Sequence, residues 1–181
     1  MYGIRFHGRG GQGVKKAAQI FARAAYLSGF HTQDFAIYGA EREGAPLTSF
    51  VRMDKKPIQI TGYIEEPDAV VVLDTTIGDK QWSAGISAKT VVLLNSYRTG
   101  ICGHVRGKCS AIDATNIAVD LVGRNVANVA MLGALVKLFA PVKWREFEKA
   151  VKIEMGKKLK REVVEKNLKA ARKCYEIVGG K

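Results

Sequence analysis

The first 29 residues restrict the fold more than any other part of the sequence, because a strand pattern, a glycine loop and a helix pattern follow one another directly. Polar and apolar residues alternate over residues 2–7, which predicts a β-strand. Residues 14–27 repeat apolar side chains at helical spacing, and Gly29 follows where a helix end accepts a left-handed residue. This order is typical of the opening unit of an α/β nucleotide-binding fold.

The loop between the two elements satisfies the pattern G-x-G-x-x-G, with the sequence Gly8-Arg9-Gly10-Gly11-Gln12-Gly13. Glycine lets the backbone turn tightly and approach a ligand, and the N-terminus of the following helix attracts an anion. Asp34 lies 21 residues beyond Gly13, which suits the ribose partner of a dinucleotide. The pattern alone leaves two interpretations open: a nucleotide or other anion site, and a tight turn that only permits close packing.

Three later segments predict buried strands of a parallel sheet. They are residues 69–74, 90–95 and 110–114, and the first two are nearly continuous runs of Val and Leu. Asp74 ends the first of these runs, at the strand end where α/β sheets gather their ligands. The alternation of strands and helices predicts a single domain over residues 1–181, with a Rossmann-like α/β fold and a layered, mostly parallel sheet.

Two departures from a simple alternation of strands and helices are expected. Residues 47–53 alternate, residues 54–57 form a turn and residues 58–60 return, which predicts a hairpin inserted into the fold. The C-terminal part is helical, with an apolar helix over residues 125–140 and amphipathic helices over about 144–157 and 162–178. Small residues in the first of these helices allow close packing against a neighbour.

Cysteine and histidine are too few and too scattered for a metal centre on this chain. Cys102, Cys109 and Cys174 include no C-x-x-C pair and cannot supply the four thiolates of an iron–sulfur cluster or a structural zinc site. We therefore expect three free thiols, and any cluster would lie on another chain. His104 lies in a glycine-rich, basic stretch and is expected to be a solvated loop residue.

Charge and hydropathy narrow the class of protein further. No stretch reaches the roughly 18 apolar residues of a transmembrane helix, and Met1 leads directly into the first strand pattern, so we expect a cytoplasmic protein. The net charge of +12 suits a nucleic acid, an acidic partner or a phosphate-rich ligand. Lysines and glutamates alternate on the outer faces of the late helices, so solvated helix surface explains most of the surplus. Aromatic residues are not interleaved with the basic ones, which argues against nucleic acid.

Five segments, in order along almost the whole chain, resemble the gamma subunits of 2-oxoacid:ferredoxin oxidoreductases. Several motifs in register are more specific than one glycine loop. The segment Tyr38-Gly39-Ala40-Glu41-Arg42-Glu43-Gly44-Ala45-Pro46 is most similar to the pyruvate (pyruvate synthase) type. The five segments are residues 4–13, 38–46 with the strand 50–52, 66–74, 113–115 and 128–134.

The resemblance implies one subunit of a multi-chain enzyme that oxidatively decarboxylates a 2-oxoacid, passes electrons to ferredoxin and forms an acyl-coenzyme A. It implies that alpha and beta subunits hold thiamine diphosphate with Mg²⁺, and that a ferredoxin-like delta subunit holds iron–sulfur clusters. This chain would hold no cofactor alone and would contribute coenzyme A access and subunit contacts in a cytoplasmic hetero-oligomer of anaerobic metabolism. We expect the isolated chain to be inactive, with no nucleic acid or membrane partner.

The glycine loop and the 38–46 segment supply the expected binding residues. Arg9 would add a fork of donors for a phosphate or carboxylate. Arg42 would either contact coenzyme A or form a salt bridge to a partner subunit, and we prefer the salt bridge. No residue is expected to be catalytic or to bind a metal. The expected cofactor-binding set is Gly8, Arg9, Gly10, Gly11, Gln12, Gly13, Arg42 and Gly44.

The sequence also departs from the family pattern and leaves alternatives. Glu43 stands where members often have a second arginine, and Val129 replaces a usual threonine, so the contacts of these positions stay open. A 2-oxoisovalerate, 2-oxoglutarate or indolepyruvate enzyme is an alternative to the pyruvate type, because the substrate pocket would lie on other chains. A stand-alone NAD(P)-dependent dehydrogenase using Asp34 is an alternative of another class.

Overall fold

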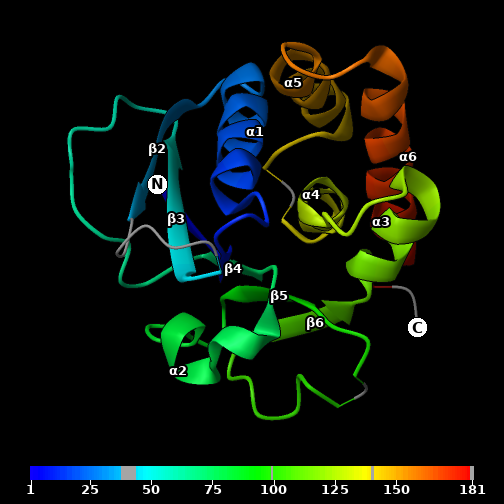
Figure 1. Ribbon diagram of the computed structural model, residues 1–181. Helices are drawn as coiled ribbons and strands as arrows, with labels where there is room; N and C mark the ends of the chain where they lie inside the picture. The colour runs from blue at the N-terminus through cyan, green and yellow to red at the C-terminus, as the bar shows by residue number, and fades with distance from the viewer. Residues whose placement is uncertain (38–43, 99, 140, 180–181) are drawn as a thin grey trace.

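A six-stranded sheet forms the centre of the protein (Figure 1). The structure is a computed structural model, and it describes residues 1–37, 44–98, 100–139 and 141–179. Its strands are β1 (Tyr2–Arg9), β2 (His31–Ile37), β3 (Pro46–Asp54), β4 (Ala69–Val72), β5 (Val91–Asn95) and β6 (Lys108–Ile112). The order across the sheet is β2-β3-β1-β4-β5-β6. Strands β1, β4, β5 and β6 run parallel, whereas β3 is antiparallel to both β1 and β2. The predicted α/β fold with a mostly parallel sheet is confirmed.

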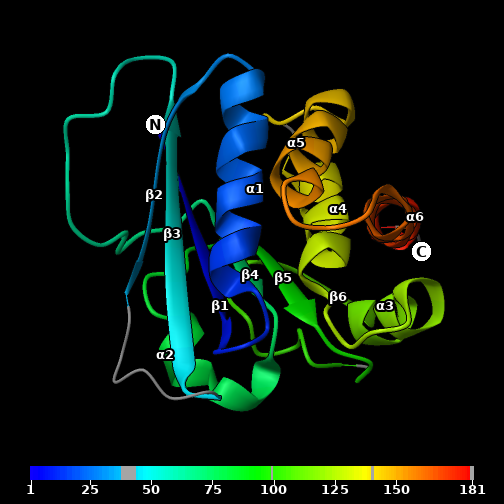
Figure 2. The same cartoon turned by 45° about the horizontal axis from the view of Figure 1, so that its top comes forward.

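The two faces of the sheet are covered unequally (Figures 1 and 2). The long helices pack on one face, where alternate strand residues such as Phe6 and Val71 join them in the main apolar cluster. On the other face, Val70 and Val92 belong to a smaller cluster with Trp82. The long helices are α1 (Val14–Leu27), α3 (Ala114–Val122), α4 (Asn128–Leu138), α5 (Trp144–Gly156) and α6 (Arg161–Ile177), and the second face carries the short η1 (Thr75–Ile77) and α2 (Asp79–Trp82).

The helices follow the predicted pattern closely. Helix α1 has the predicted bounds, and Gly29 adopts the expected left-handed conformation with φ 82°. Helix α4 begins three residues later than predicted, and residues Asn128 to Val136 are all buried because neighbouring helices surround it. The predicted close packing is confirmed at Gly133, where an added Cβ would lie 2.0 Å from the Ala171 carbonyl oxygen of α6.

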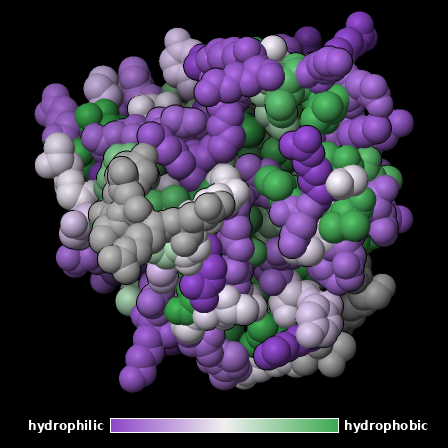
Figure 3. Space-filling model, in the orientation of Figure 1, coloured by the Kyte–Doolittle hydropathy of each residue, from purple (hydrophilic) through white to green (hydrophobic). Residues whose placement is uncertain are grey.

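The late helices carry much of their charge on the outside, as predicted. Lys152 pairs with Glu148 on α5 at 2.6 Å, and Lys166 pairs with Glu162 on α6 at 2.8 Å. On the face seen in Figure 3, hydrophilic residues cover most of the surface and apolar ones form small scattered groups. These pairs place charged side chains of both signs on the solvated surface of the late helices.

The prediction that residues 47–53 form a hairpin with residues 58–60 is wrong. The antiparallel partners of β3 are β2 and β1, which use both of its edges, and residues 58–60 form no strand. The hairpin insertion is instead made by β2 and β3. Strand β3 therefore offers the 58–60 run no free edge to pair with.

The expectation of three free thiols is also wrong. Cys102 and Cys109 form a disulfide, and Cys174 is the buried free thiol. The glycine-rich turn before β6 folds Cys102 back onto the strand, and the spacing of the two cysteines does not by itself predict this pairing. Burial, followed by the nearby Asp113, raises the pKa of Cys174 to about 12, so this thiol stays protonated.

Candidate functional site

The glycine loop joins the carboxyl end of β1 to α1 and is held in place by Gln12. The side-chain Oε1 of Gln12 accepts a hydrogen bond from the Arg9 backbone N–H at 2.8 Å. Its Nε2 donates to the Asp74 carboxylate at 2.7 Å, which links the loop to the residue that follows β4. Gln12 thus closes the loop on itself and ties it to the neighbouring strand.

Asp74 is the acceptor for several donors at the end of β4. Its Oδ1 accepts the backbone N–H of Thr76 at 2.9 Å and the Thr76 hydroxyl at 2.6 Å, and the Arg9 Nε lies 3.3 Å from Oδ2. Burial raises the pKa of Asp74, but the hydrogen bonds from Thr76 and Gln12 and the charge of Arg9 outweigh it and hold that pKa below 3.8. The carboxylate therefore stays ionised and holds the loop.

Arg9 is bound to the protein through most of its donors. Its Nη1 donates to the Gly44 carbonyl at 3.1 Å, and Nη2 donates to the carbonyl and hydroxyl of Thr76 at 3.1 and 2.9 Å. The backbone of Gly10 also donates to the Ala45 carbonyl at 2.9 Å. The structure thus brings together Arg9 and Gly44, two members of the expected binding set, with Arg9 as a link between segments.

Two of the loop glycines have a packing reason for being glycine. A Cβ at Gly8 would lie 2.8 Å from the Val14 side chain. At Gly13, where φ is 76°, a Cβ would lie 2.3 Å from the Asn128 side-chain nitrogen. The interpretation as a tight turn with close packing therefore holds for these two positions, whatever the loop binds.

A cavity of about 610 Å³ lies where the strands β4, β5 and β6 end, beside the glycine loop. Its position agrees with the rule that open α/β sheets bind ligands outside the carboxyl ends of their strands. The lining is mainly polar, with Arg98 as its single cation among the described residues. It consists of Gln12, Leu73, Asp74, Thr75, Thr76, Asn95, Ser96, Tyr97, Arg98, Asp113, Thr115, Asn116, Asn125, Val126, Ala127 and Asn128.

Two helix N-termini meet at this cavity. Helix α1 begins after Gly13 and α4 begins after Ala127, and neither of these two residues caps its helix with a side chain. The Asn128 amide joins them by donating to the Gly13 carbonyl at 3.3 Å. The positive ends of both helix dipoles and the guanidinium of Arg98 attract an anion here, whereas the carboxylates of Asp74 and Asp113 in the same lining oppose it.

Two other polar residues of the lining, Asn95 and Asp113, are committed to the fold. Asn95 accepts the backbone N–H groups of Ala114 and Thr115, and donates to Leu73 O at 2.9 Å. Asp113 caps α3 by accepting the Asn116 N–H at 3.0 Å. Since the carboxylates of Asp74 and Asp113 are both hydrogen-bonded, these groups position the wall of the cavity.

The dinucleotide interpretation of Asp34 is wrong. Asp34 pairs with Val51 in the middle of β2, and β3 separates β2 from β1 and its glycine loop. An acidic ribose partner needs a place at the end of a strand beside the loop, and Asp34 is exposed on an edge strand. Arg42 lies outside the described residues, so its expected contacts stay a prediction.

Sequence reasoning missed several residues of the cavity. Tyr97 and Arg98 follow the end of β5, and Asn125 lies just before α4, within the helix predicted over residues 125–140. The strand-end rule that singled out Asp74 also applies to residues 96–98, and would have found them. In the described part of the chain, no group of His, Cys, Asp and Glu is arranged to hold a metal ion, and no helix is long and apolar enough to cross a bilayer.

Comparison with known proteins identifies the family. The family model for pyruvate ferredoxin/flavodoxin oxidoreductase matches residues 3–177. The Pyrococcus furiosus common subunit gamma of pyruvate/ketoisovalerate oxidoreductases is 41% identical over 182 residues, which cover 97% of this chain and 96% of that one. The Thermotoga maritima pyruvate synthase subunit PorC is 39% identical over 183 residues, covering 97% and 93%.

The fold comparison agrees with the sequence comparison. The crystal structure of the pyruvate oxidoreductase subunit PORC from Thermotoga maritima superposes with a TM-score of 0.85 and 34% identity. The superposition covers 98% of this chain and 96% of that one, so the likeness extends over the whole domain. The chain therefore belongs to the pyruvate ferredoxin/flavodoxin oxidoreductase family, as a gamma subunit of a multi-subunit 2-oxoacid:ferredoxin oxidoreductase.

Proposed function

We propose that this gamma subunit serves the pyruvate type of the enzyme, and that the cavity between the N-termini of α1 and α4 forms part of the path by which coenzyme A reaches the catalytic subunits. The observation that carries the proposal is the meeting of two helix N-termini and Arg98 at one polar cavity. Coenzyme A is rich in phosphate, and positive helix ends with an arginine bind phosphate.

The residues of this chain bind and orient, and we assign none of them to the chemical steps. When bound, coenzyme A supplies the thiol that accepts the acyl group. Arg98 and the two helix N-termini suit its phosphates, while the amides of Gln12 and Asn128 fix the two walls relative to each other. Arg9 acts as a positioning residue, because its contacts to Asp74, Thr76 and Gly44 already use most of its donors.

The remaining cofactors belong to the partners in this proposal. Thiamine diphosphate with Mg²⁺ lies on alpha and beta subunits, and the iron–sulfur clusters lie on a ferredoxin-like delta subunit. The cysteine inventory supports this division, because two of the three cysteines form a disulfide and the third is buried. Arg42 and the 38–46 segment are proposed to contact a partner subunit.

A coenzyme A titration of the full-length chain tests the cavity. We expect Arg98→Ala to weaken coenzyme A binding by about 10–100-fold, since charge-assisted hydrogen bonds to phosphate contribute about 1.5–3 kcal/mol. The matched control is Arg145→Ala, which removes the same charge from the exposed side of α5, outside the cavity lining. Isothermal titration calorimetry measures both, and equal losses in the two variants would contradict the site.

The substrate class needs its own experiment. The chain, tagged at Lys181 and recovered from its host without oxygen, is expected to bring thiamine-diphosphate-binding and ferredoxin-like chains with it. Coenzyme A-dependent reduction of a viologen dye is then compared with pyruvate, 2-oxoisovalerate, 2-oxoglutarate and indolepyruvate. The proposal requires pyruvate to be the best substrate, and a preference for another of the four would replace it.

A further inference from the structure

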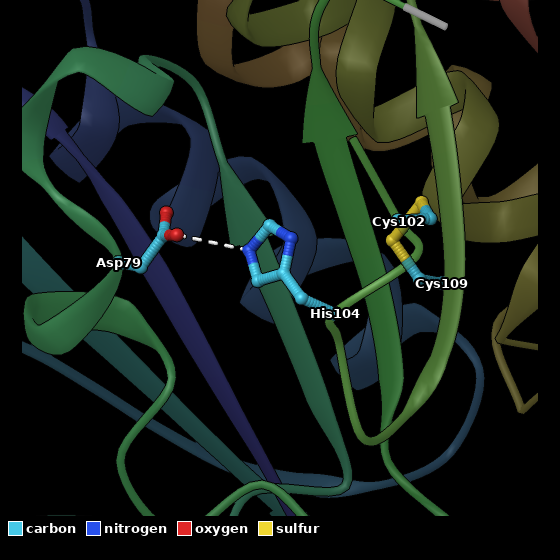
Figure 4. Close-up of a disulfide and its surroundings, with 4 residues drawn as sticks. All are labelled: Asp79, Cys102, His104 and Cys109. Carbon is cyan, nitrogen blue, oxygen red and sulfur yellow. Dashed lines mark ion pairs between the residues drawn. A yellow bond between two sulfur atoms is a disulfide. The ribbon is translucent and has the colours of Figure 1, made fainter. Parts of the chain in front are cut away.

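The Cys102–Cys109 disulfide ties a loop to the edge of the sheet (Figure 4). Cys109 lies on the edge strand β6, and Cys102 lies seven residues earlier in the preceding turn. Both cysteines are half-buried and pack against the second-face cluster that includes Val92 and Leu94. A bond in this position, partly open to solvent, can be reached by an attacking thiolate, whereas a disulfide inside the core cannot.

Few other contacts hold the loop between the two cysteines. Among the described residues, it has two backbone hydrogen bonds within the turn, a third from the Lys108 N–H to the Thr90 carbonyl at 2.7 Å, and an apolar contact of Val105 with the second-face cluster, which Ile101, just before Cys102, also joins. His104 pairs with Asp79 of α2 at 2.9 Å, and both side chains are more than half exposed. An exposed ion pair restrains a loop weakly, so the disulfide is its main covalent and conformational restraint.

The same loop continues into the wall of the proposed coenzyme A cavity. A second cavity of about 470 Å³ is lined by Gly100, Ile101 and Cys102, together with residues 96–98. Residues 96–98, which include Arg98, also line the larger cavity. Residues 96–98 therefore form a wall shared by the two cavities, and the smaller one reaches Cys102 of the disulfide.

The charges around the bond favour its exchange with thiols. Residues 96–112 include Arg98, Arg106 and Lys108 and no acidic residue, while Asp79 pairs with His104 and Asp113 lines the adjoining cavity. Positive surroundings stabilise a thiolate, and a cysteine that leaves readily as a thiolate makes its disulfide easier to cleave. The eight-residue closed loop also restrains little of the chain, so the two apolar clusters keep the fold when the bond opens.

We propose that Cys102–Cys109 is a site of reversible exchange with a dithiol of the thioredoxin class, and that its reduction loosens the wall that carries Arg98. A thiolate of the dithiol attacks one sulfur, the S–S bond breaks, and the other cysteine leaves as a thiolate that takes up a proton. The second thiol of the reductant then resolves the mixed disulfide, so the chain gains two electrons and two protons and the reductant becomes a disulfide. The effect on coenzyme A rests on the proposed function, whereas the exchange does not.

Cysteine alkylation and amide hydrogen exchange of the chain test the thiol–disulfide exchange and the loosening of the 100–108 loop. Reduced thioredoxin or dithiothreitol is added without denaturant, and alkylation followed by mass spectrometry reports which cysteines react. We expect Cys102 and Cys109 to become reactive while the buried Cys174 stays unreactive, and amides of residues 100–108 to exchange at least about tenfold faster. In the double variant Cys102→Ser/Cys109→Ser, the same amides should exchange their hydrogens fast with or without dithiol. A bond that opens only on unfolding, or opens with unchanged hydrogen exchange, overturns the proposal.

Coenzyme A affinity tests the coupling to the cavity. The dissociation constant of the oxidised chain is expected to rise several-fold on reduction, and that of the double variant to be insensitive to dithiol. Equal affinity of the oxidised and reduced chains overturns the coupling. If coenzyme A binds in neither state, the proposed function fails, and the hydrogen-exchange result still decides whether the disulfide is an exchange site.

Discussion

At the residue scale, Asp74 holds the glycine loop in its observed geometry. Its carboxylate accepts hydrogen bonds from Gln12 and Thr76 and pairs with Arg9. Asp74→Asn would place an amide N–H against these donors, so we expect the free energy of unfolding to fall by about 1–3 kcal/mol. Urea denaturation at pH 7 measures it, with Asp34→Asn on the exposed face of β2 as the control, expected to change it by less than about 0.5 kcal/mol.

The same residue contributes to the pH dependence of stability. Because the pKa of Asp74 is lower in the folded chain than its ordinary 3.8, its contribution is present above 3.8 and is lost as the pH falls through the folded value. The difference in stability between wild type and Asp74→Asn should therefore shrink on acidification below pH 3.8. A difference that stays constant down to pH 2.5 would show that the carboxylate charge contributes nothing.

At the scale of the elements, Glu154 joins α5 to α1. Lys16 and Arg23 of α1 each lie 3.0 Å from its carboxylate, and Lys157 lies at the same distance. Burial opposes its ionisation, but the hydrogen bonds of Lys16 and Lys157 outweigh burial and lower the pKa of Glu154 from 4.5 to about 2. Its stabilisation is therefore complete above about pH 4.5 and is lost as the pH falls towards 2.

Glu154→Gln tests this contact between the two helices. We expect the variant to lose about 1–3 kcal/mol of stability at pH 7 and to approach wild type near pH 2, where Glu154 itself becomes protonated. The control is Glu148→Gln, which removes an exposed pair with Lys152 on the same helix and should cost about 0.5 kcal/mol or less. Chemical denaturation at several pH values compares the two, and equal losses would contradict a special role for the buried carboxylate.

The contact of α4 with α6 depends on Gly133. Its added Cβ would lie 2.0 Å from the Ala171 carbonyl oxygen, which is backbone and cannot rotate away. Gly133→Ala should therefore destabilise the chain by about 2–4 kcal/mol. Gly156→Ala at the end of α5 meets no atom within 4 Å and should leave stability unchanged or raise it by up to about 1 kcal/mol. Thermal unfolding separates the two variants, and a tolerated alanine at Gly133 would show that the helices can move apart.

At the scale of the whole molecule, the chain is one part of an enzyme. We expect the purified chain to contain no bound iron and to reduce no viologen dye with pyruvate and coenzyme A, because we propose only binding and positioning roles for its residues. Adding the alpha, beta and delta subunits should restore the reaction. Stoichiometric iron in the isolated chain, or dye reduction by it alone, would contradict this division of roles.

Local sequence patterns predicted the parts of the structure that depend on local interactions. Helix α1 has the bounds that the spacing of its apolar residues and the position of Gly29 indicated, because periodicity and a left-handed glycine act within a few residues. The continuous apolar run before Asp74 predicted a strand ending there, and β4 ends two residues earlier, at Val72. The family resemblance rested on several motifs in order, and it is confirmed by both comparisons.

Only the tertiary structure decided which segments meet. The sequence of residues 47–60 is compatible with a hairpin, but β2 and β1 occupy both edges of β3. The spacing of Asp34 suits a ribose partner, but β3 separates its strand from the glycine loop. The Cys102–Cys109 disulfide and the cavity beside Arg98 likewise depend on how segments pack together. Pattern and spacing determine how each element forms, whereas strand order and the approach of distant residues depend on packing over the whole chain, which no local window of sequence contains.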